Sequence, residues 1–316
     1  MTGRIDTGAV RLLDLAGTTL AVRQWGDPAG RPVLLWHALG SETSGAWYAE
    51  QAAVLAGRGL HVVAPDGPGF GASPPLPPEA YAVPRLAGLA WAVADALGLD
   101  RPVLVGHSWG GLVMLAAAAT RPADTAGLVL LDSGHHDYAV RPGAHPEWTL
   151  AERTASIDAR ITDYADVEAL RSSLQDDVRR PVPDALVAAA LAAMRTGPDG
   201  RLRPVVAGRT VAAAQAGMLA ERPLDRWPVI AAAGVDVLLL LATEPTRDAS
   251  EEGAATVLAA HPGAEVRLLE GWGHDLVADG GPALGAMVAD WVLDPGARGL
   301  RPLGRPCAQG VRSRRR

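Results

Sequence analysis

The sequence contains no lysine, one cysteine and one phenylalanine among its 316 residues. With Cys307 alone, no intramolecular disulfide can form, which agrees with a reducing compartment. The net charge of −6 excludes a general attraction to nucleic acid, since such binding needs a concentrated basic face. Only residues 298–316 are strongly basic, and they are also rich in Gly and Pro. We therefore expect residues 295–316 to form a disordered basic tail.

Long hydrophobic runs are absent as well. The longest apolar stretches, such as Leu112–Ala119, are too short to cross a bilayer. The N-terminus carries the charged residues Arg4, Asp6 and Arg11 where a secretory peptide would need an apolar segment. What is present is a hydrophobic content of 48%, enough for a large buried core. These features predict a cytoplasmic protein without a membrane or nucleic-acid partner.

Short apolar runs alternate with stretches of helical periodicity over much of the chain. The runs that predict strands are Val33–Trp36, His61–Ala64, Val103–Val105, Leu128–Leu131, Val235–Leu241 and Val266–Leu269. The stretches that predict helices are Trp47–Arg58, Val83–Leu97, Leu112–Ala119, Glu251–Ala260 and Pro282–Trp291. Strands that alternate with helices indicate parallel strands joined by crossover helices, so the predicted fold class is α/β.

The middle of the chain breaks this alternation. Residues 134–225 contain no convincing strand and consist of Ala-rich helical stretches interrupted by prolines. We interpret this segment as a helical cap over the carboxyl edge of the sheet. The core would then comprise residues 1–133 and 226–294.

The strongest chemical signal is Gly106-His-Ser108-Trp-Gly110. An apolar strand precedes it and a helix follows, which is the context that gives a G-x-S-x-G match its meaning. The tight turn would force Ser108 into a strained conformation and expose its hydroxyl above the sheet. We predict that Ser108 is a nucleophile; the alternative is a serine that only caps the helix.

A serine hydroxyl needs a neighbouring base to take its proton. His274 is the best candidate, because it follows a predicted strand and precedes the last predicted helix. Gly271 and Gly273 would let the intervening loop bend back to the sheet edge. The alternative is a surface histidine without a catalytic role.

Four segments in order carry a family resemblance: His37-Ala-Leu-Gly40, Val63–Ser73, Gly106–Gly111 and Gly273-His274. Over about residues 10–294 the chain resembles the α/β-hydrolase family, in its serine hydrolase branch with a helical cap. The resemblance implies a mostly parallel eight-stranded sheet flanked by helices. It also implies a small-molecule substrate and no cofactor.

The resemblance further implies an oxyanion hole. Its backbone N–H donors would be those of Leu39 and of Trp109, the residue after the nucleophile. Ala38 stands where the family usually has glycine, and it would be strained if that position needed a positive φ.

The acid that should orient the histidine has three candidates. The family most often places it after the seventh strand, where this chain has Glu244 and Asp248 but Pro245 at the usual position. Some members, including certain haloalkane dehalogenases, use an acid at the preceding strand end, where Asp132 lies. We favour Asp132, while Glu244 and Asp248 remain alternatives. Many members also carry an acid at this position that only ties down loops.

The predicted function is hydrolysis of an ester, lactone or small amide through an acyl-enzyme on Ser108. By resemblance, epoxide hydrolases and haloalkane dehalogenases attack with Asp, so Ser108 argues against both. Carbon–carbon hydrolases, lyases and cofactor-free haloperoxidases share the Ser-His-acid set and stay open, as does a ligand-binding receptor with vestigial catalysis. We predict no metal site, since the adjacent His135 and His136 would point opposite ways on an extended chain.

Overall fold

The computed structural model describes residues 8–15, 17–141 and 143–293. Its centre is one eight-stranded sheet in the order β1-β2-β4-β3-β5-β6-β9-β10. The strands are β1 (Ala9–Leu15), β2 (Thr18–Trp25), β3 (Arg31–Trp36), β4 (Leu60–Pro65), β5 (Val103–His107), β6 (Gly127–Leu131), β9 (Val237–Ala242) and β10 (Glu265–Leu269). Strands β4, β3, β5, β6, β9 and β10 run parallel, whereas β1 and β2 pair antiparallel. The predicted mostly parallel sheet is confirmed.

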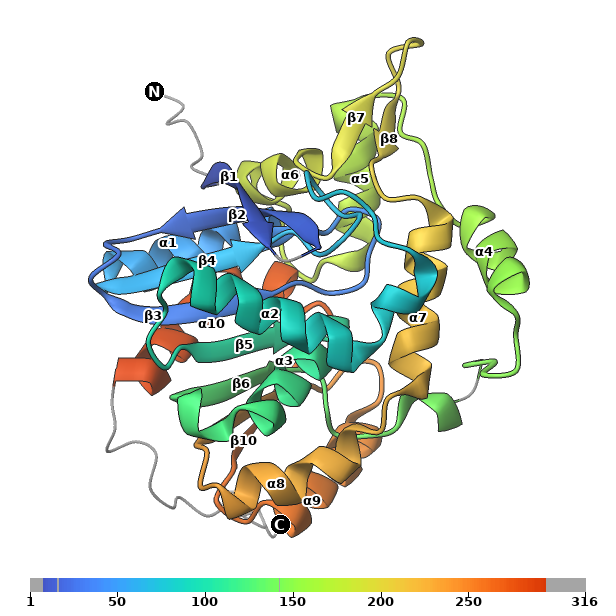
Figure 1. Ribbon diagram of the computed structural model, residues 1–316. Coiled ribbons are helices and arrows are strands. Elements are labelled where there is room, and N and C mark those ends of the chain that lie inside the picture. The colour runs from blue at the N-terminus through green and yellow to red at the C-terminus, as the bar shows by residue number, and fades with distance from the viewer. Residues whose placement is uncertain (1–7, 16, 142, 294–316) are drawn as a thin grey trace, which may run out of the picture.

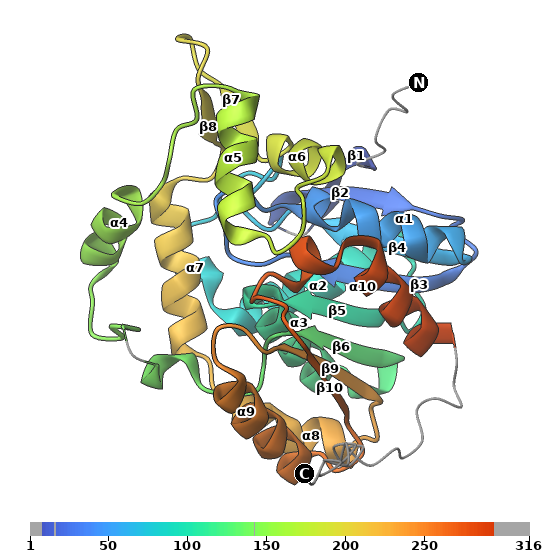
Figure 2. The same ribbon diagram turned by 180° about the vertical axis from the view of Figure 1, so that it is seen from behind.

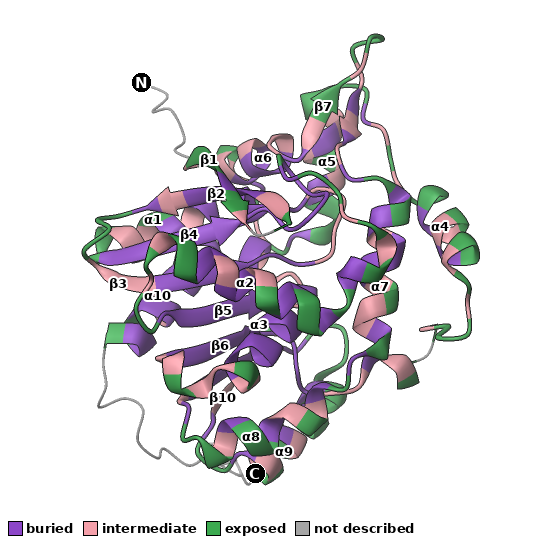
Figure 3. Ribbon diagram, viewed as in Figure 1, coloured by how far each residue is buried: buried purple, intermediate pink, exposed green. Residues whose placement is uncertain are grey.

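Helices cover both faces of this sheet (Figures 1 and 2). One layer holds α2 (Val83–Leu97), α3 (Trp109–Thr120), α8 (Trp227–Ala232) and α9 (Arg247–Ala260), and the other holds α1 (Ala49–Gly57) and α10 (Leu276–Leu293). The side chains of the central strands pack against both helix layers, because successive side chains of a strand point to opposite faces of the sheet. In β5, Leu104 joins the first core cluster, while Val103 and Val105 join the second. The central strands are buried throughout (Figure 3).

The segment between β6 and β9 lies over the carboxyl ends of the parallel strands (Figures 1 and 2). It contains α4 (Leu150–Asp158), α5 (Val167–Asp177), α6 (Asp184–Leu191) and α7 (Gly208–Ala220). It also contains a hairpin of β7 (Met194–Thr196) and β8 (Leu202–Pro204). The expectation that this segment has no strand is therefore wrong. With three residues each, these strands are too short to show an alternating pattern in the sequence.

The last helix also differs from the prediction. Helix α10 begins at Leu276 rather than Pro282, and it is kinked at Gly281, where φ is +46°. Pro282 starts the straight part after the kink, because a proline cannot donate to the preceding turn. By length and composition, α10 alone among the described helices could cross a membrane, although no apolar run in the sequence suggested one. However, 61% of its apolar window is buried in the protein, as in a core helix. The predicted basic tail lies outside the described residues.

The turn between β5 and α3 depends on close backbone contact with β3. A Cβ added to Gly110 would lie 2.1 Å from the Trp36 carbonyl oxygen. Gly110→Ala is expected to lower the free energy of unfolding by about 1–3 kcal/mol, because the backbone must shift to relieve the overlap. Thermal or urea unfolding measures this. Gly88→Ala in α2, where an added Cβ meets nothing within 4 Å, is the control and should stabilise slightly. Equal unfolding transitions for the two variants would contradict the packing argument.

Candidate active site

Parallel pairing brings Ser108 and Asp132 to the same edge of the sheet. In the register of β5 and β6, His107 pairs with Leu131, so the next residue of each strand lies at the carboxyl edge. Both residues have positive φ, +52° at Ser108 and +48° at Asp132. Non-glycine residues adopt such a conformation at an energetic cost, which is typical of functional turns. Each strand therefore ends in a sharp turn that projects a polar side chain above the sheet.

His274 joins these two side chains in one hydrogen-bonded row. Its Nε2 lies 2.9 Å from Ser108 Oγ and its Nδ1 lies 2.5 Å from Asp132 Oδ2. A carboxylate can only accept a hydrogen bond, so Nδ1 carries the proton and the Nε2 lone pair faces the hydroxyl. The other carboxylate oxygen, Asp132 Oδ1, accepts from the Ala242 amide at 3.2 Å. A proton can thus pass from the serine hydroxyl to the imidazole.

The electrostatics of the pair favour a charged imidazole. Burial lowers the pKa of His274, but the hydrogen bond and the charge of Asp132 outweigh it, and the net shift is upward. For Asp132, burial raises the pKa, while the hydrogen bond and charge of His274 bring it below its usual value. The carboxylate therefore stabilises the imidazolium that forms when His274 accepts a proton.

The two other acid candidates do not reach His274. Glu244 and Asp248 are exposed, and neither forms a hydrogen bond or ion pair with the imidazole among the described residues. The Glu244 amide instead donates to the Trp272 carbonyl, which ties the two loops together. Of the three acids that the sequence left open, the structure brings only Asp132 to the histidine.

The loop that contains His274 is held by a hydrogen bond from His107, a residue for which the sequence predicted no role. His107 Nε2 donates to the His274 carbonyl oxygen at 2.7 Å. Burial lowers the pKa of His107, so the ring is neutral and this nitrogen carries its proton. Its position next to Ser108 was the only signal in the sequence. Ser133 acts similarly on the other strand, since its Oγ donates to the Ser108 carbonyl at 2.6 Å.

Buried side chains fix the segment after β3. His37 Nε2 accepts from the Gly67 amide at 2.8 Å, and its Nδ1 lies 2.8 Å from the Ala38 carbonyl oxygen. Burial lowers the pKa of His37 to about 4, so the ring is neutral. Thr43 Oγ1 also donates to the Ala38 carbonyl, at 2.8 Å. Ala38 does not have a positive φ, so the strain considered for this position does not arise.

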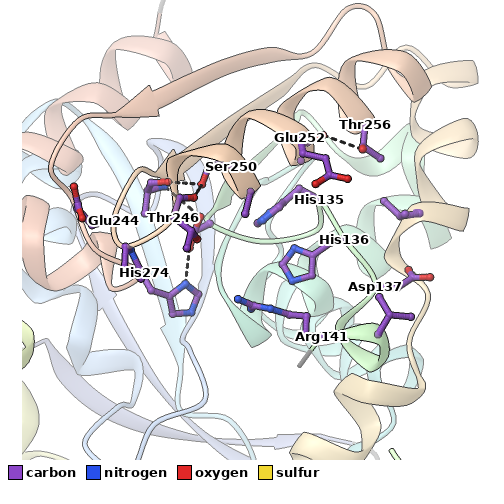
Figure 4. Close-up of a pocket in the computed structure, with 17 residues that line it drawn as sticks. His135, His136, Asp137, Arg141, Glu244, Thr246, Ser250, Glu252, Thr256 and His274 are labelled. Atoms are coloured by element: carbon purple, nitrogen blue, oxygen red, sulfur yellow. Dashed lines mark hydrogen bonds and ion pairs between the residues drawn. The ribbon is translucent and has the colours of Figure 1, made fainter. Parts of the chain in front are cut away.

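Two cavities meet at His274. The smaller cavity, of about 180 Å³, is lined by Leu39, Gly40, Trp47, Ser108, Leu174 and His274 among others. The larger cavity, of about 580 Å³, includes Asp132, His135, His136, Arg141, Glu252 and His274 in its lining (Figure 4). The described residues contain no cluster of three or more side chains that could hold a metal ion. The prediction that His135 and His136 point opposite ways is wrong, because the chain turns after β6: their ring centroids lie 4.3 Å apart and both rings line the larger cavity.

Comparison with known proteins agrees with this fold. A family model described as alpha/beta hydrolase fold matches residues 31–173. The solved structure of E-2-(acetamidomethylene)succinate hydrolase superposes with a TM-score of 0.73 at 22% identity, covering 90% of this chain and 99% of that chain. The chain has the α/β-hydrolase fold. A thioesterase domain from the curacin biosynthetic pathway shares the fold with a TM-score of 0.70 at 22% identity, over 90% of this chain and 99% of that domain.

Curated relatives of this chain match over a shorter stretch. Epoxide hydrolase A of Mycobacterium tuberculosis is 39% identical over 33% of this chain and 32% of its own length. A haloalkane dehalogenase of Psychrobacter cryohalolentis is 36% identical over 34% of this chain and 36% of its own. The chain thus spans about a third of the length of these two relatives. The matches support the fold family without selecting one of its reactions.

Proposed function

We propose that this protein is a serine hydrolase of the α/β-hydrolase family that cleaves an ester, lactone or small amide through an acyl-enzyme on Ser108. The observation that carries the proposal is the hydrogen-bonded row from Ser108 through His274 to Asp132, with contacts of 2.9 and 2.5 Å. By the family resemblance, epoxide hydrolases and haloalkane dehalogenases, the classes after which two of the relatives are named, attack with aspartate. The serine at position 108 favours acyl transfer over both.

The mechanism has two steps. Ser108 Oγ forms a bond to the substrate carbonyl carbon while its proton passes to His274 Nε2. His274 then donates that proton to the leaving group, whose bond to the carbonyl carbon breaks. In the second step, water loses a proton to the same nitrogen and forms a bond to the acyl carbon. The bond between that carbon and Ser108 Oγ then breaks, His274 returns the proton to Oγ, and the acid is released.

The oxyanion would be stabilised by the backbone N–H groups of Leu39 and Trp109. As the first residue of α3, Trp109 has no acceptor for its N–H within the helix. The Leu39 amide donates to no acceptor in the part of the chain that the structure describes. Two unused donors beside the nucleophile suit a developing negative charge, and each is typically worth about 3 kcal/mol in the transition state.

The sizes of the two cavities suggest which part of a substrate each cavity would bind. The smaller cavity contains Ser108 and the Leu39 segment, so we assign it to a small acyl group. The larger cavity also reaches His274 but does not include Ser108 in its lining, so we assign it to the leaving group, which would extend past the imidazole. We propose that residues 134–225 act as a cap, because α5 contributes Leu174 to the smaller cavity and the start of the segment lines the larger one.

A short acyl ester tests this proposal directly. On mixing with p-nitrophenyl acetate, we expect a burst of p-nitrophenol and, after acid quenching, a mass increase of one acetyl group on the peptide that contains Ser108. An epoxide and a haloalkane serve as comparison substrates and should not be turned over. Binding of the ester without product release would instead favour a receptor with vestigial catalysis, and acetylation elsewhere would contradict the assignment of Ser108.

A further inference from the structure

Arg141 lines the larger cavity and has no acidic partner. It follows the short helix η4 (Tyr138–Val140), and its amide donates to the Tyr138 carbonyl at 3.3 Å. Its guanidinium carbon lies 5.9 Å from the centre of the Tyr138 ring. Among the described residues, no carboxylate oxygen lies within 4.0 Å of its nitrogens. Its planar set of N–H donors therefore remains available to a ligand.

Arg141 is exposed, but its side chain is directed along the cavity rather than away from it. Figure 4 shows Arg141 extending along the cavity toward His274, with the His136 ring beside it. Its positive charge disfavours protonation of His136 and His274 and so acts to lower the pKa of each. An arginine that points across a concave cavity at the proposed proton donor is placed to contact a bound molecule.

Of the four described acidic residues that line the larger cavity, two are paired within the protein. Asp132 is bound to His274, and Asp137 lies 3.3 Å from Arg222. Burial lowers the pKa of His136 to about 3, so this ring is neutral at physiological pH. Arg141 is thus the one arginine among the described residues in the cavity lining.

We propose that Arg141 binds a carboxylate on the leaving-group side of the substrate. The inference rests on the proposed function, since it assigns the larger cavity to the group that His274 protonates. A guanidinium pairs with a carboxylate through two parallel hydrogen bonds, which fix orientation as well as charge. The preferred substrate is then an ester or amide with a small acyl group and an anionic alcohol or amine portion.

Two exposed glutamates also line this cavity and limit where the anion can lie. Glu244 follows β9, and Glu252 lies on α9. Both would repel a carboxylate, so the anion is expected next to Arg141, away from the wall formed by α9. A cationic substrate would be expected against that wall instead, which makes the sign of the preferred charge a direct test.

The kinetic test compares two acetate esters that differ in one charge. We expect the wild type to favour para-acetoxybenzoate over its neutral analogue para-acetoxybenzamide, as a ratio of kcat/KM. Arg141→Gln should lower this ratio by about ten- to a hundredfold, because a charged hydrogen-bonding partner is lost. Arg247→Gln is the matched control, since Arg247 is exposed, pairs with Glu251 and Glu270, and does not line the cavity. An unchanged ratio in Arg141→Gln would overturn the proposal, as would a wild-type preference for an ester with a trimethylammonium group.

A binding measurement separates this inference from the proposed function. Titration calorimetry of para-hydroxybenzoate and para-hydroxybenzamide needs no turnover. We expect the wild type to bind the carboxylate more tightly than the amide, with the difference lost in Arg141→Gln and kept in Arg247→Gln. If no ester is hydrolysed but this pattern holds, the proposed reaction fails and the anion site stands. If esters are hydrolysed and the two products bind equally, the anion site fails alone.

Discussion

Ser108→Ala is expected to lower kcat/KM for p-nitrophenyl acetate by about 10⁴- to 10⁶-fold. The hydroxyl oxygen 2.9 Å from His274 Nε2 is the atom that would form the acyl bond, and alanine offers no replacement. Labelling by a fluorophosphonate, which reacts with an activated serine, should disappear in the same variant. Stopped-flow or steady-state release of p-nitrophenol measures the first effect, and mass spectrometry of the labelled protein measures the second.

The Ser108→Ala variant should otherwise resemble the wild type. Position 108 has a φ of +52° in a turn that the surrounding backbone holds, and alanine tolerates this conformation about as well as serine. Circular dichroism and the melting temperature are therefore expected to stay close to the wild-type values. Full esterase activity in a folded Ser108→Ala variant would refute the proposed nucleophile and, with it, the acyl-enzyme mechanism.

Asp132→Asn is expected to lower kcat/KM by about 10⁴-fold. The asparagine can no longer hold the Nδ1 proton of His274 as a charged acceptor, so the imidazole loses its preferred tautomer and the imidazolium loses its counter-charge. The charged Asp132 carboxylate helps to raise the pKa of His274, so the pKa of His274 should be lower in the variant than in the wild type. Steady-state kinetics across a pH series measures both effects.

The sign of the pH effect follows from the role of the base. His274 must be neutral to accept a proton, so kcat/KM should rise with pH through its pKa, which in the wild type lies above the usual 6.5. In Asp132→Asn, the residual activity should rise at a lower pH. Glu244→Gln and Asp248→Asn test the two alternative acids, since both residues are exposed and neither contacts His274; Asp248, which does not line the larger cavity, is the matched control. Near wild-type activity in Asp132→Asn, with a large loss in either of these two variants, would assign the acid to the later loop.

The sequence predicted the central strands and the helices next to them closely. Their runs are continuous and apolar because parallel strands are buried on both faces, which gives a strong signal. The run Leu128–Leu131 lies within β6, and Val83–Leu97 coincides with α2. Strands β1 and β2 were not predicted individually, since β1 is largely exposed and lacks that continuous apolar character.

The segment between β6 and β9 was harder to predict. The sequence predicted helices there without their bounds, because Ala-rich stretches interrupted by prolines do not mark where each helix begins and ends. The hairpin of β7 and β8 was not predicted, because two strands of three residues are specified by their pairing rather than by alternation. The kink at Gly281 in α10 is also a product of packing, and the sequence showed only the proline that follows it.

By itself, the sequence determined the fold class and two of the residues that the proposed chemistry needs. A glycine-flanked serine between a strand and a helix, and a glycine-flanked histidine before the last helix, are local patterns that need no three-dimensional information. The tertiary structure decided which acid meets the histidine, how His107 and Ser133 support the site, and where Arg141 points. Those relations depend on strand order and register, which bring residues far apart in the chain to one edge of the sheet.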